Sequence, residues 1–145
     1  MYVLGIALAV TVVDQLTKLA VQQDMVLHES IPVIPGFFHI TYILNRGAAF
    51  GILENQQWFF LVIALVLFLL YGLFRKQLPA NPWVYGGFGL LLGGALGNAL
   101  DRTFLGAVTD FFDFRIWPVF NVADIGIVVG VVLLLWYSWT HISDK

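Results

Sequence analysis

The chain has 145 residues, of which 60% are hydrophobic and 11% charged, and its mean hydropathy of +0.88 exceeds what a soluble domain of this size can bury in one core. The absence of cysteine excludes disulfide bridges, thiolate nucleophiles and cysteine zinc sites. A net charge of -2 without a long basic run excludes nucleic acid as a partner, so the composition indicates a membrane protein whose apolar surface faces lipid.

Four apolar segments follow one another along the chain, each close to the roughly 20 residues that a helix needs to cross a bilayer. They cover residues 3–21, 58–74, 83–100 and 124–140. The first contains Asp14 and Lys18, which the apolar core of a cleaved signal peptide would not tolerate, so we interpret it as a retained helix. The pattern predicts a mainly α-helical membrane protein with four transmembrane helices in a single domain, residues 1–145.

The segment between the first two predicted helices, residues 24–55, is too polar and too rich in turn residues to cross a membrane. Within it, residues 37–44 alternate with the period of a strand that has one apolar face. We therefore expect a small β-sheet platform there, lying on the membrane surface. Counting basic residues on the two sides gives a tie, but Arg75 and Lys76 lie together beside a span, which favours cytoplasmic termini.

Ionisable side chains within a span are costly, so each one is a candidate for function. Asp14 and Lys18 are four residues apart on the first predicted helix and therefore lie on one face, with the acid N-terminal to the base. This spacing predicts a mutual ion pair that packs against another helix. We favour that structural role over direct catalysis.

Two further acids flank the start of the fourth predicted helix. Asp110 precedes it in "AVTDFFDF", and Asp124 falls in its first turn in "FNVADIG". Two carboxylates that share one small polar site cannot easily both ionise, so one holds a proton while the other deprotonates water, as in aspartic proteases. Taken alone, Asp124 is more simply a capping residue behind the N-cap Asn121, and Asp110 or its neighbour Asp113 a solvated loop acid.

Further polar residues would lie beside these acids at the same ends of the predicted helices. They are Asn45 and Arg46 in "NRGAAFG" and Asn98, Asp101 and Arg102 in "GGALGNALDR". Neither the serines nor the histidines show the spacing of a known hydrolase motif.

Three other functions remain open from the residues alone. A proton-coupled transporter or channel subunit would also use intramembrane acids, although no repeat is visible. A lipid-headgroup transferase would bind Mg²⁺ through Asp101, Asp110 and Asp113. A membrane scaffold would explain the spans but not the clustered acids.

Taken together, these motifs resemble the lipoprotein signal peptidases, the bacterial type II signal peptidases, over nearly the whole chain. The matching pieces are, in order, "DQLTK" from Asp14 to Lys18, "NRGAAFG" from Asn45, "GNALDR" from Gly97, "AVTDFF" from Ala107 and "FNVAD" from Phe120. Their order and spacing make the match specific, whereas any one piece would be weak.

The resemblance implies an aspartic endopeptidase of the bacterial inner membrane. It would cut the signal peptide from a prolipoprotein just before a diacylglyceryl-modified cysteine, with Asp110 and Asp124 as the catalytic dyad. Further site residues, lining the pocket or supporting it, would be Asn45, Asn98, Arg102, Asp14, Lys18, Asp101 and Asn121. The resemblance also implies cytoplasmic termini and an active site near the extracytoplasmic face. We expect no cofactor or metal, and we expect a monomer that contacts membrane lipid and its lipidated substrates.

Overall fold

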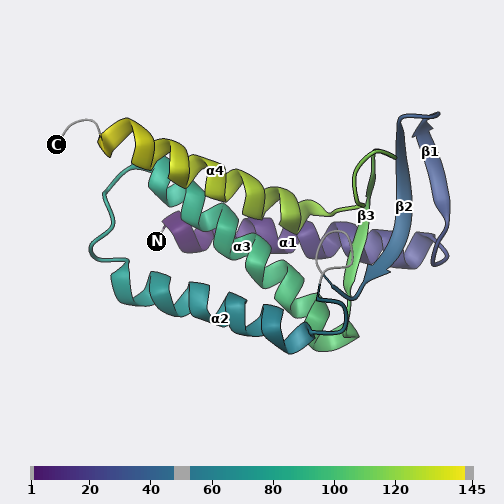
Figure 1. Ribbon diagram of the computed structural model, residues 1–145, viewed down its shortest axis with the longest axis horizontal. Coiled ribbons are helices and arrows are strands. Elements are labelled where there is room, and N and C mark those ends of the chain that lie inside the picture. Colours follow the sequence, from purple (N-terminus) through teal and green to yellow (C-terminus); the bar gives the residue numbers. More distant parts are fainter. Residues whose placement is uncertain (1, 48–52, 143–145) are drawn as a thin grey trace.

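The computed structural model describes residues 2–47 and 53–142 and has four helices and three strands in these parts of the chain (Figure 1). In chain order the elements are α1 (Tyr2–Asp24), β1 (Ser30–Ile34), β2 (Phe38–Asn45), α2 (Gln57–Phe74), α3 (Pro82–Leu105), β3 (Val108–Asp113) and α4 (Val122–Ile142). Each of the four predicted apolar segments lies within one of the helices.

Three helices in the described part of the chain are long and apolar enough to cross a membrane, namely α1, α2 and α4. The helix α3, which contains the predicted third span, is as long as these, with 24 residues, but six of them are glycine and its last turns carry Asp101 and Arg102. It packs against all three other helices and has the most buried residues of the four. Because α3 is covered by protein, it can be less hydrophobic than helices that face lipid.

The helix α1 meets α3 along one narrow stripe. Its buried positions recur every three or four residues, which is the period of one helix face, and they are Val3, Ala7, Thr11, Asp14, Lys18 and Val21. Two glycines of α3 make the close approach possible. A Cβ added at Gly97 would collide with the Asp14 carboxylate, and one added at Gly94 would collide with the Ala123 carbonyl oxygen at the start of α4. The small residues therefore bring α1, α3 and α4 together at the level of Asp14.

The three strands form one antiparallel sheet in the order β1-β2-β3. The prediction of a strand at residues 37–44 is confirmed by β2. The sheet was predicted to lie wholly between the first two helices, but only β1 and β2 do. The third strand, β3, follows α3 and pairs with β2, so that Ile43 lies opposite Asp110. Residues 48–52, near the end of the predicted platform, lie outside the described residues.

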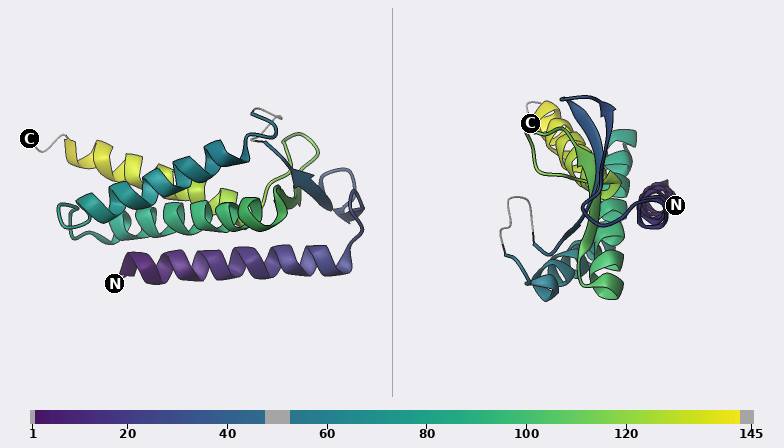
Figure 2. Two further views of the ribbon diagram at one scale, coloured as in Figure 1. Left: turned by 90° about the horizontal axis from the view of Figure 1, so that it is seen from below. Right: turned by 90° about the vertical axis from the view of Figure 1, so that its right-hand side faces the viewer.

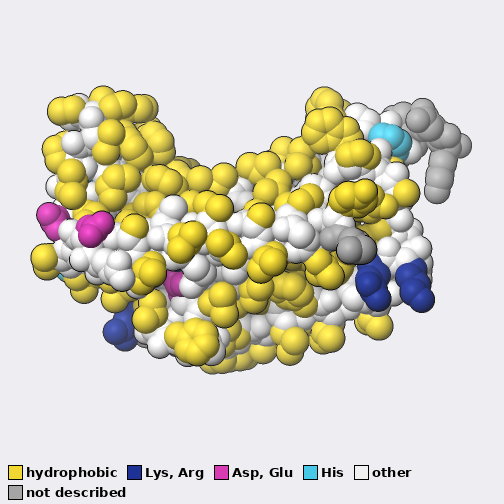
Figure 3. Space-filling model, turned by 180° about the vertical axis from the view of Figure 1, so that it is seen from behind, with side chains coloured by type: hydrophobic (Ala, Val, Ile, Leu, Met, Phe, Trp, Pro, Cys, Tyr) yellow, Lys and Arg dark blue, Asp and Glu magenta, His cyan; other side chains and the backbone are white. Residues whose placement is uncertain are grey.

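The sheet sits at one end of the helices, with its strands running across the helix axes (Figures 1 and 2). The start of α1, the end of α4 and the loop between α2 and α3 lie together at the opposite end. Seen from behind, the helices carry a largely hydrophobic belt, and most charged side chains on this face lie toward the two ends (Figure 3). This distribution is typical of an integral membrane protein.

Candidate active site

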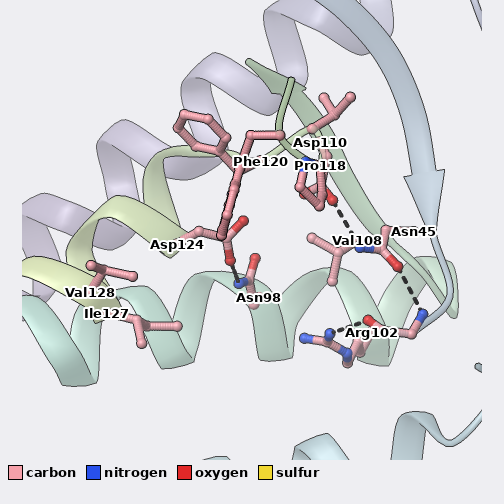
Figure 4. A pocket seen from close by; sticks show the side chains of 13 residues that line it. Asn45, Asn98, Arg102, Val108, Asp110, Pro118, Phe120, Asp124, Ile127 and Val128 are labelled. Carbon is pink, nitrogen blue, oxygen red and sulfur yellow. Dashed lines mark hydrogen bonds between the residues drawn. The ribbon is translucent and has the colours of Figure 1, made fainter. Parts of the chain in front are cut away.

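A cavity of about 260 Å³ opens where the sheet meets the last turns of α3 and the first turn of α4 (Figure 4). It draws residues from β2, β3, α3 and α4 and from the loop before α4. The polar side chains among its lining residues are Asn45, Asn98, Arg102, Asp110 and Asp124. The structure thus brings both predicted dyad acids to one cavity.

Asp124 is fixed by the N-terminus of α4. Its Oδ2 accepts a hydrogen bond from the Asn121 backbone N–H at 3.1 Å, while its own N–H donates to Asn121 Oδ1 at 2.9 Å. This reciprocal pair is a capping box, so the predicted capping role of both residues is confirmed. The other oxygen, Oδ1, is left to accept from Asn98 Nδ2 at 2.8 Å, on the side of the cavity.

Asp110 reaches the cavity from β3 and is almost fully buried, with 2% of its surface exposed. Its two oxygens accept hydrogen bonds from Asn121 Nδ2 at 2.7 Å and from Asn45 Nδ2 at 3.1 Å. Burial, and after it the nearby charge of Asp124, raise the pKa of the Asp110 carboxyl from its ordinary value of 3.8 to about 7. The two amide hydrogen bonds oppose this rise without cancelling it. A carboxyl with a pKa in this range can hold a proton near neutral pH.

Two asparagines connect the acids. The Asn121 side chain donates to Asp110 and to Asn98 Oδ1 while its oxygen caps the Asp124 N–H. The Asn98 side chain in turn donates to Asp124 and accepts from Lys18 Nζ at 3.0 Å. The two carboxylates therefore belong to one continuous hydrogen-bonded network rather than to separate sites.

Behind this network lies a buried cluster of charges between α1 and α3. Lys18 Nζ is 2.9 Å from Asp14 Oδ2 and 3.1 Å from Asp101 Oδ2, which confirms the predicted ion pair and adds a second acid to it. Asp14 also accepts the backbone N–H of Ala123 at 2.8 Å, and Asp101 accepts that of Thr109 at 2.9 Å. The cluster therefore holds the residues that directly precede Asp124 and Asp110.

One member of this cluster was not singled out from the sequence. Gln15 donates to Asp14, to the Gly97 carbonyl oxygen and, at 2.9 Å, to Asp101 Oδ1. The signal that could have found it is its amide group within an apolar span, where a polar side chain needs a partner. Thr109, buried beside Asp110, was also missed, because a threonine in a polar stretch carries no such signal.

Arg102 lines the mouth of the cavity. One of its terminal nitrogens donates to the Gly47 carbonyl oxygen at 3.1 Å, and its guanidinium lies over the Phe60 ring, 4.3 Å from the centroid. Its Nε is buried and has no hydrogen-bond partner among the described residues. Asn45 is held beside it, since its oxygen accepts the Gly47 N–H at 2.9 Å.

Asp113 lies apart from the cavity. Its Oδ2 accepts from Thr41 Oγ1 at 2.7 Å and from the Arg115 guanidinium at 3.0 Å. Burial acts to raise the pKa of the Asp113 carboxyl, but these hydrogen bonds and the Arg115 charge outweigh it and lower the pKa.

The acids that would bind Mg²⁺ in the transferase alternative lie apart. Asp101 is paired with Lys18. The described residues contain no group of three or more His, Asp or Glu that could hold a metal ion, so the acids of the Mg²⁺ alternative do not converge.

A second, mostly apolar cavity of about 280 Å³ adjoins the first between α2, α3 and α4 and shares Asn98, Arg102, Asp124 and Ile127 with it. Its other walls are Phe60, Ile63, Ala64, Leu67, Leu91, Ala95 and Ala99. The polar cavity is thus reached from an apolar slot between helices.

Comparison with known proteins gives a consistent set of relatives. Residues 6–140 match the family model described as "Signal peptidase (SPase) II". The lipoprotein signal peptidase of Pelotomaculum thermopropionicum is 49% identical over 147 aligned residues, covering 100% of this chain and 95% of that protein. The lipoprotein signal peptidase of Halothermothrix orenii is 46% identical over 134 residues, covering 92% of each.

Solved structures show the same likeness. A bacterial membrane enzyme determined by the in meso method at 2.3 Å resolution superposes with a TM-score of 0.92 at 36% identity, over 99% of this chain and 90% of that one. Another, at 1.9 Å resolution, gives a TM-score of 0.82 at 38% identity, over 93% and 90%. The likeness therefore extends over nearly the whole of each chain.

Proposed function

Because this chain belongs to the signal peptidase II family, we propose that it removes signal peptides from prolipoproteins as an aspartic endopeptidase, with Asp110 and Asp124 as the catalytic pair. One observation carries the proposal. Two acids from different elements line one cavity and are joined through Asn121, and the pKa of Asp110 is raised to about 7. That is the environment in which a pair of carboxyls keeps one proton at neutral pH.

In this mechanism the pair starts with one proton. The ionised member takes a proton from water as the water oxygen attacks the scissile carbonyl carbon, and the protonated member donates its proton to the carbonyl oxygen, which gives a neutral tetrahedral diol. When the diol collapses, one member takes a proton from a hydroxyl group as the C–N bond breaks, and the other donates its proton to the leaving nitrogen. The pair therefore ends each step with one proton, as it began. Which acid has which part is left unassigned, because a coupled pair titrates as a unit.

The amides around the acids supply positioning. Asn98 and Asn45 each hold one acid from the cavity side, and the Arg102 guanidinium stands at the mouth with one N–H unpartnered in the described structure. Such donors can bind the carbonyl oxygens of an extended peptide and hold the scissile bond against the pair.

The apolar slot between α2, α3 and α4 gives the substrate a way in from the membrane. Only Ala64 of α2 is buried, so α2 is loosely held against its neighbours. We propose that the substrate's apolar signal helix lies along this slot while its lipid chains stay in the bilayer. The cut would then fall where the slot meets the polar cavity, just before the lipidated cysteine.

The same geometry supports a topology. We propose that all four helices cross the bacterial inner membrane, with α3 shielded by the others, and that the enzyme acts as a monomer. The start of α1, the end of α4 and the loop with Arg75 and Lys76 share one end, which we assign to the cytoplasm. The sheet and the cavity then lie at the extracytoplasmic face.

The test uses purified protein and a diacylglyceryl-modified prolipoprotein, with the mass of the released fragment as the readout. Asp110→Asn and Asp124→Asn should each abolish cleavage while the protein still unfolds cooperatively. Asp24→Asn, at an exposed acid at the end of α1, is the matched control and should cleave normally. Full activity in either cavity variant would remove that acid from the pair.

A further inference from the structure

In the loop between β3 and α4, which covers residues 114–121, the part from 114 to 119 exposes two large apolar side chains next to the cavity. Ile116 is 87% exposed, the highest value among the large hydrophobic residues that the structure describes, and Trp117 is 60% exposed. Exposed apolar side chains gathered at one place on a protein mark a contact surface.

Hydrogen bonds within the loop and at its base fix its shape. Asp113 Oδ1 accepts the Arg115 backbone N–H at 2.8 Å, and Arg115 has a φ of 66°, a left-handed conformation that non-glycine residues rarely adopt. The base of the loop is closed by backbone hydrogen bonds between Phe112 and Phe120. The loop therefore presents its tip in a fixed direction.

Aromatic rings support the loop from the side of the sheet. The Phe114 ring packs on Phe38 at 4.8 Å between centroids and stacks on Phe120 at 5.9 Å. Because Phe114 is held inward, the next residues along the loop are directed outward.

The loop tip is continuous with the apolar face of α4. Trp117 and Phe120 line an open, mostly apolar hollow together with Asp124, Ile125, Val128 and Val129 of α4. Figure 3 shows the surface hollowed between the sheet end and the far half of α4, with hydrophobic side chains on both sides. The helix α4 is long and apolar enough to span a membrane. The membrane crossing proposed above would place lipid against its exposed face, and the same lipid would extend to the loop.

We propose that residues 114–119 anchor the sheet end of the protein in the membrane interface, with Ile116 and Trp117 at the boundary between headgroups and acyl chains. Tryptophan favours this depth, and Arg115, the residue before Ile116, adds a guanidinium that pairs with Asp113 and is still 49% exposed, so its open side can contact lipid phosphates. Trp117 and Pro118 also line the polar cavity. The anchor therefore fixes the height of one cavity wall relative to the lipid.

The anchoring rests on the membrane crossing of α4, and its value for a lipid-attached substrate rests on the proposed function. The first test retains Trp117 as the only tryptophan, with phenylalanine at the four other tryptophans, in nanodiscs that hold one copy of the protein. Phosphatidylcholine brominated near the headgroup end of its acyl chains should quench Trp117 emission, and aqueous iodide should quench it weakly. A variant that retains only Trp136, exposed on α4, is the control for quenching by lipid.

Strong quenching by iodide without quenching by brominated lipid would overturn the proposal. So would shielding of Trp117 that appears only when a disc holds two copies, because a second chain would then cover the loop. Neither readout depends on peptide cleavage, so each can fail while the proposed function holds.

The second test changes Ile116, which does not line the cavity. Ile116→Asp should reduce bromolipid quenching of Trp117 and raise the KM for lipidated substrate in liposomes several-fold with little change in kcat, whereas Ile116→Leu should change neither. Unchanged quenching in Ile116→Asp would contradict the anchor. Altered quenching with an unchanged KM would retain the anchor but remove its role in substrate access.

Discussion

The buried charge cluster makes a strong prediction about stability. In Lys18→Met, a side chain of similar length replaces the lysine, and both Asp14 and Asp101 lose their counter-charge. The exposed surfaces of these two acids are 0% and 4%, so water cannot replace the lost ammonium group. Asn98 loses the donor at its Oδ1 as well.

The expected cost follows from the geometry. Lys18 has three acceptors at 2.9, 3.0 and 3.1 Å, so all three of its N–H groups are used. Removing one partner of a buried ion pair costs about 3–5 kcal/mol. The remaining hydrogen bonds to Asp14 and Asp101 stabilise the ionised acids in part, which places Lys18→Met toward the lower half of that range.

The assay is reversible unfolding in mixed micelles, with Lys76→Met, at an exposed lysine after α2, as the control. A double variant, Lys18→Met with Asp101→Asn, returns the cluster to its original net charge. It should lose less stability than the two single changes together, by about 0.5–3 kcal/mol. A free energy of unfolding for Lys18→Met within about 0.5 kcal/mol of the unchanged protein, the range of ordinary surface substitutions, would refute this account of the cluster.

Four further outcomes are expected. Asn98→Ala removes a hydrogen bond to the Asp124 carboxylate worth about 1.5–3 kcal/mol, and its cleavage rate should fall about 10- to 150-fold in steady-state assays. Because the pKa of Asp110 rises from 3.8 to about 7 on folding, its contribution to stability is complete below pH 3.8 and is lost as the pH rises through about 7. The free energy of unfolding should therefore fall by about 1.4 kcal/mol per pH unit between these values relative to Asp110→Asn, as measured by unfolding at several pH values. Gly97→Ala should destabilise the protein by about 1–3 kcal/mol in the same unfolding assay, because the added methyl group collides with the Asp14 carboxylate. Incubation with a chelator should leave cleavage unchanged, and a loss that Mg²⁺ restores would contradict the proposed mechanism.

The helices were predictable because each forms a long apolar run, and their ends were found to within three residues except at the C-terminal end of α3, which extends five residues beyond the predicted residue 100. The strand β3 was not predictable from its pattern. All its residues except Phe112 are buried, so the sequence "VTDFFD" shows no alternation between an apolar and a polar face. Asp110 and Asp113 also disfavour a strand on their own. The strand forms because its backbone pairs with the edge of β2. The two strands are far apart in the chain, since Asn45 of β2 and its partner Asp110 of β3 are separated by 65 positions.

The site was predictable in its acids and only partly in their support. Asp14 and Lys18 could be paired from their spacing alone, since both lie on one helix. That Asp101 completes the cluster depends on how α3 packs against α1, which spacing cannot reveal. The same holds for Gln15, whose amide joins the two helices.

In the structure, a capping role for Asp124 is compatible with the proposed chemical role. A carboxylate has two oxygens, and in this protein they face different partners. Oδ2 closes the capping box with Asn121, whereas Oδ1 points toward Asn98 and the cavity. The cap fixes the orientation of the group, and the same Asn121 holds Asp110 at 2.7 Å. The N-terminus of α4 therefore fixes the positions of both proposed catalytic acids. Because Asn121 caps the helix and also binds Asp110, Asn121→Ala should reduce kcat and the stability of the helix together. A variant that lost stability but kept kcat would show that the cap and the proposed chemistry are independent.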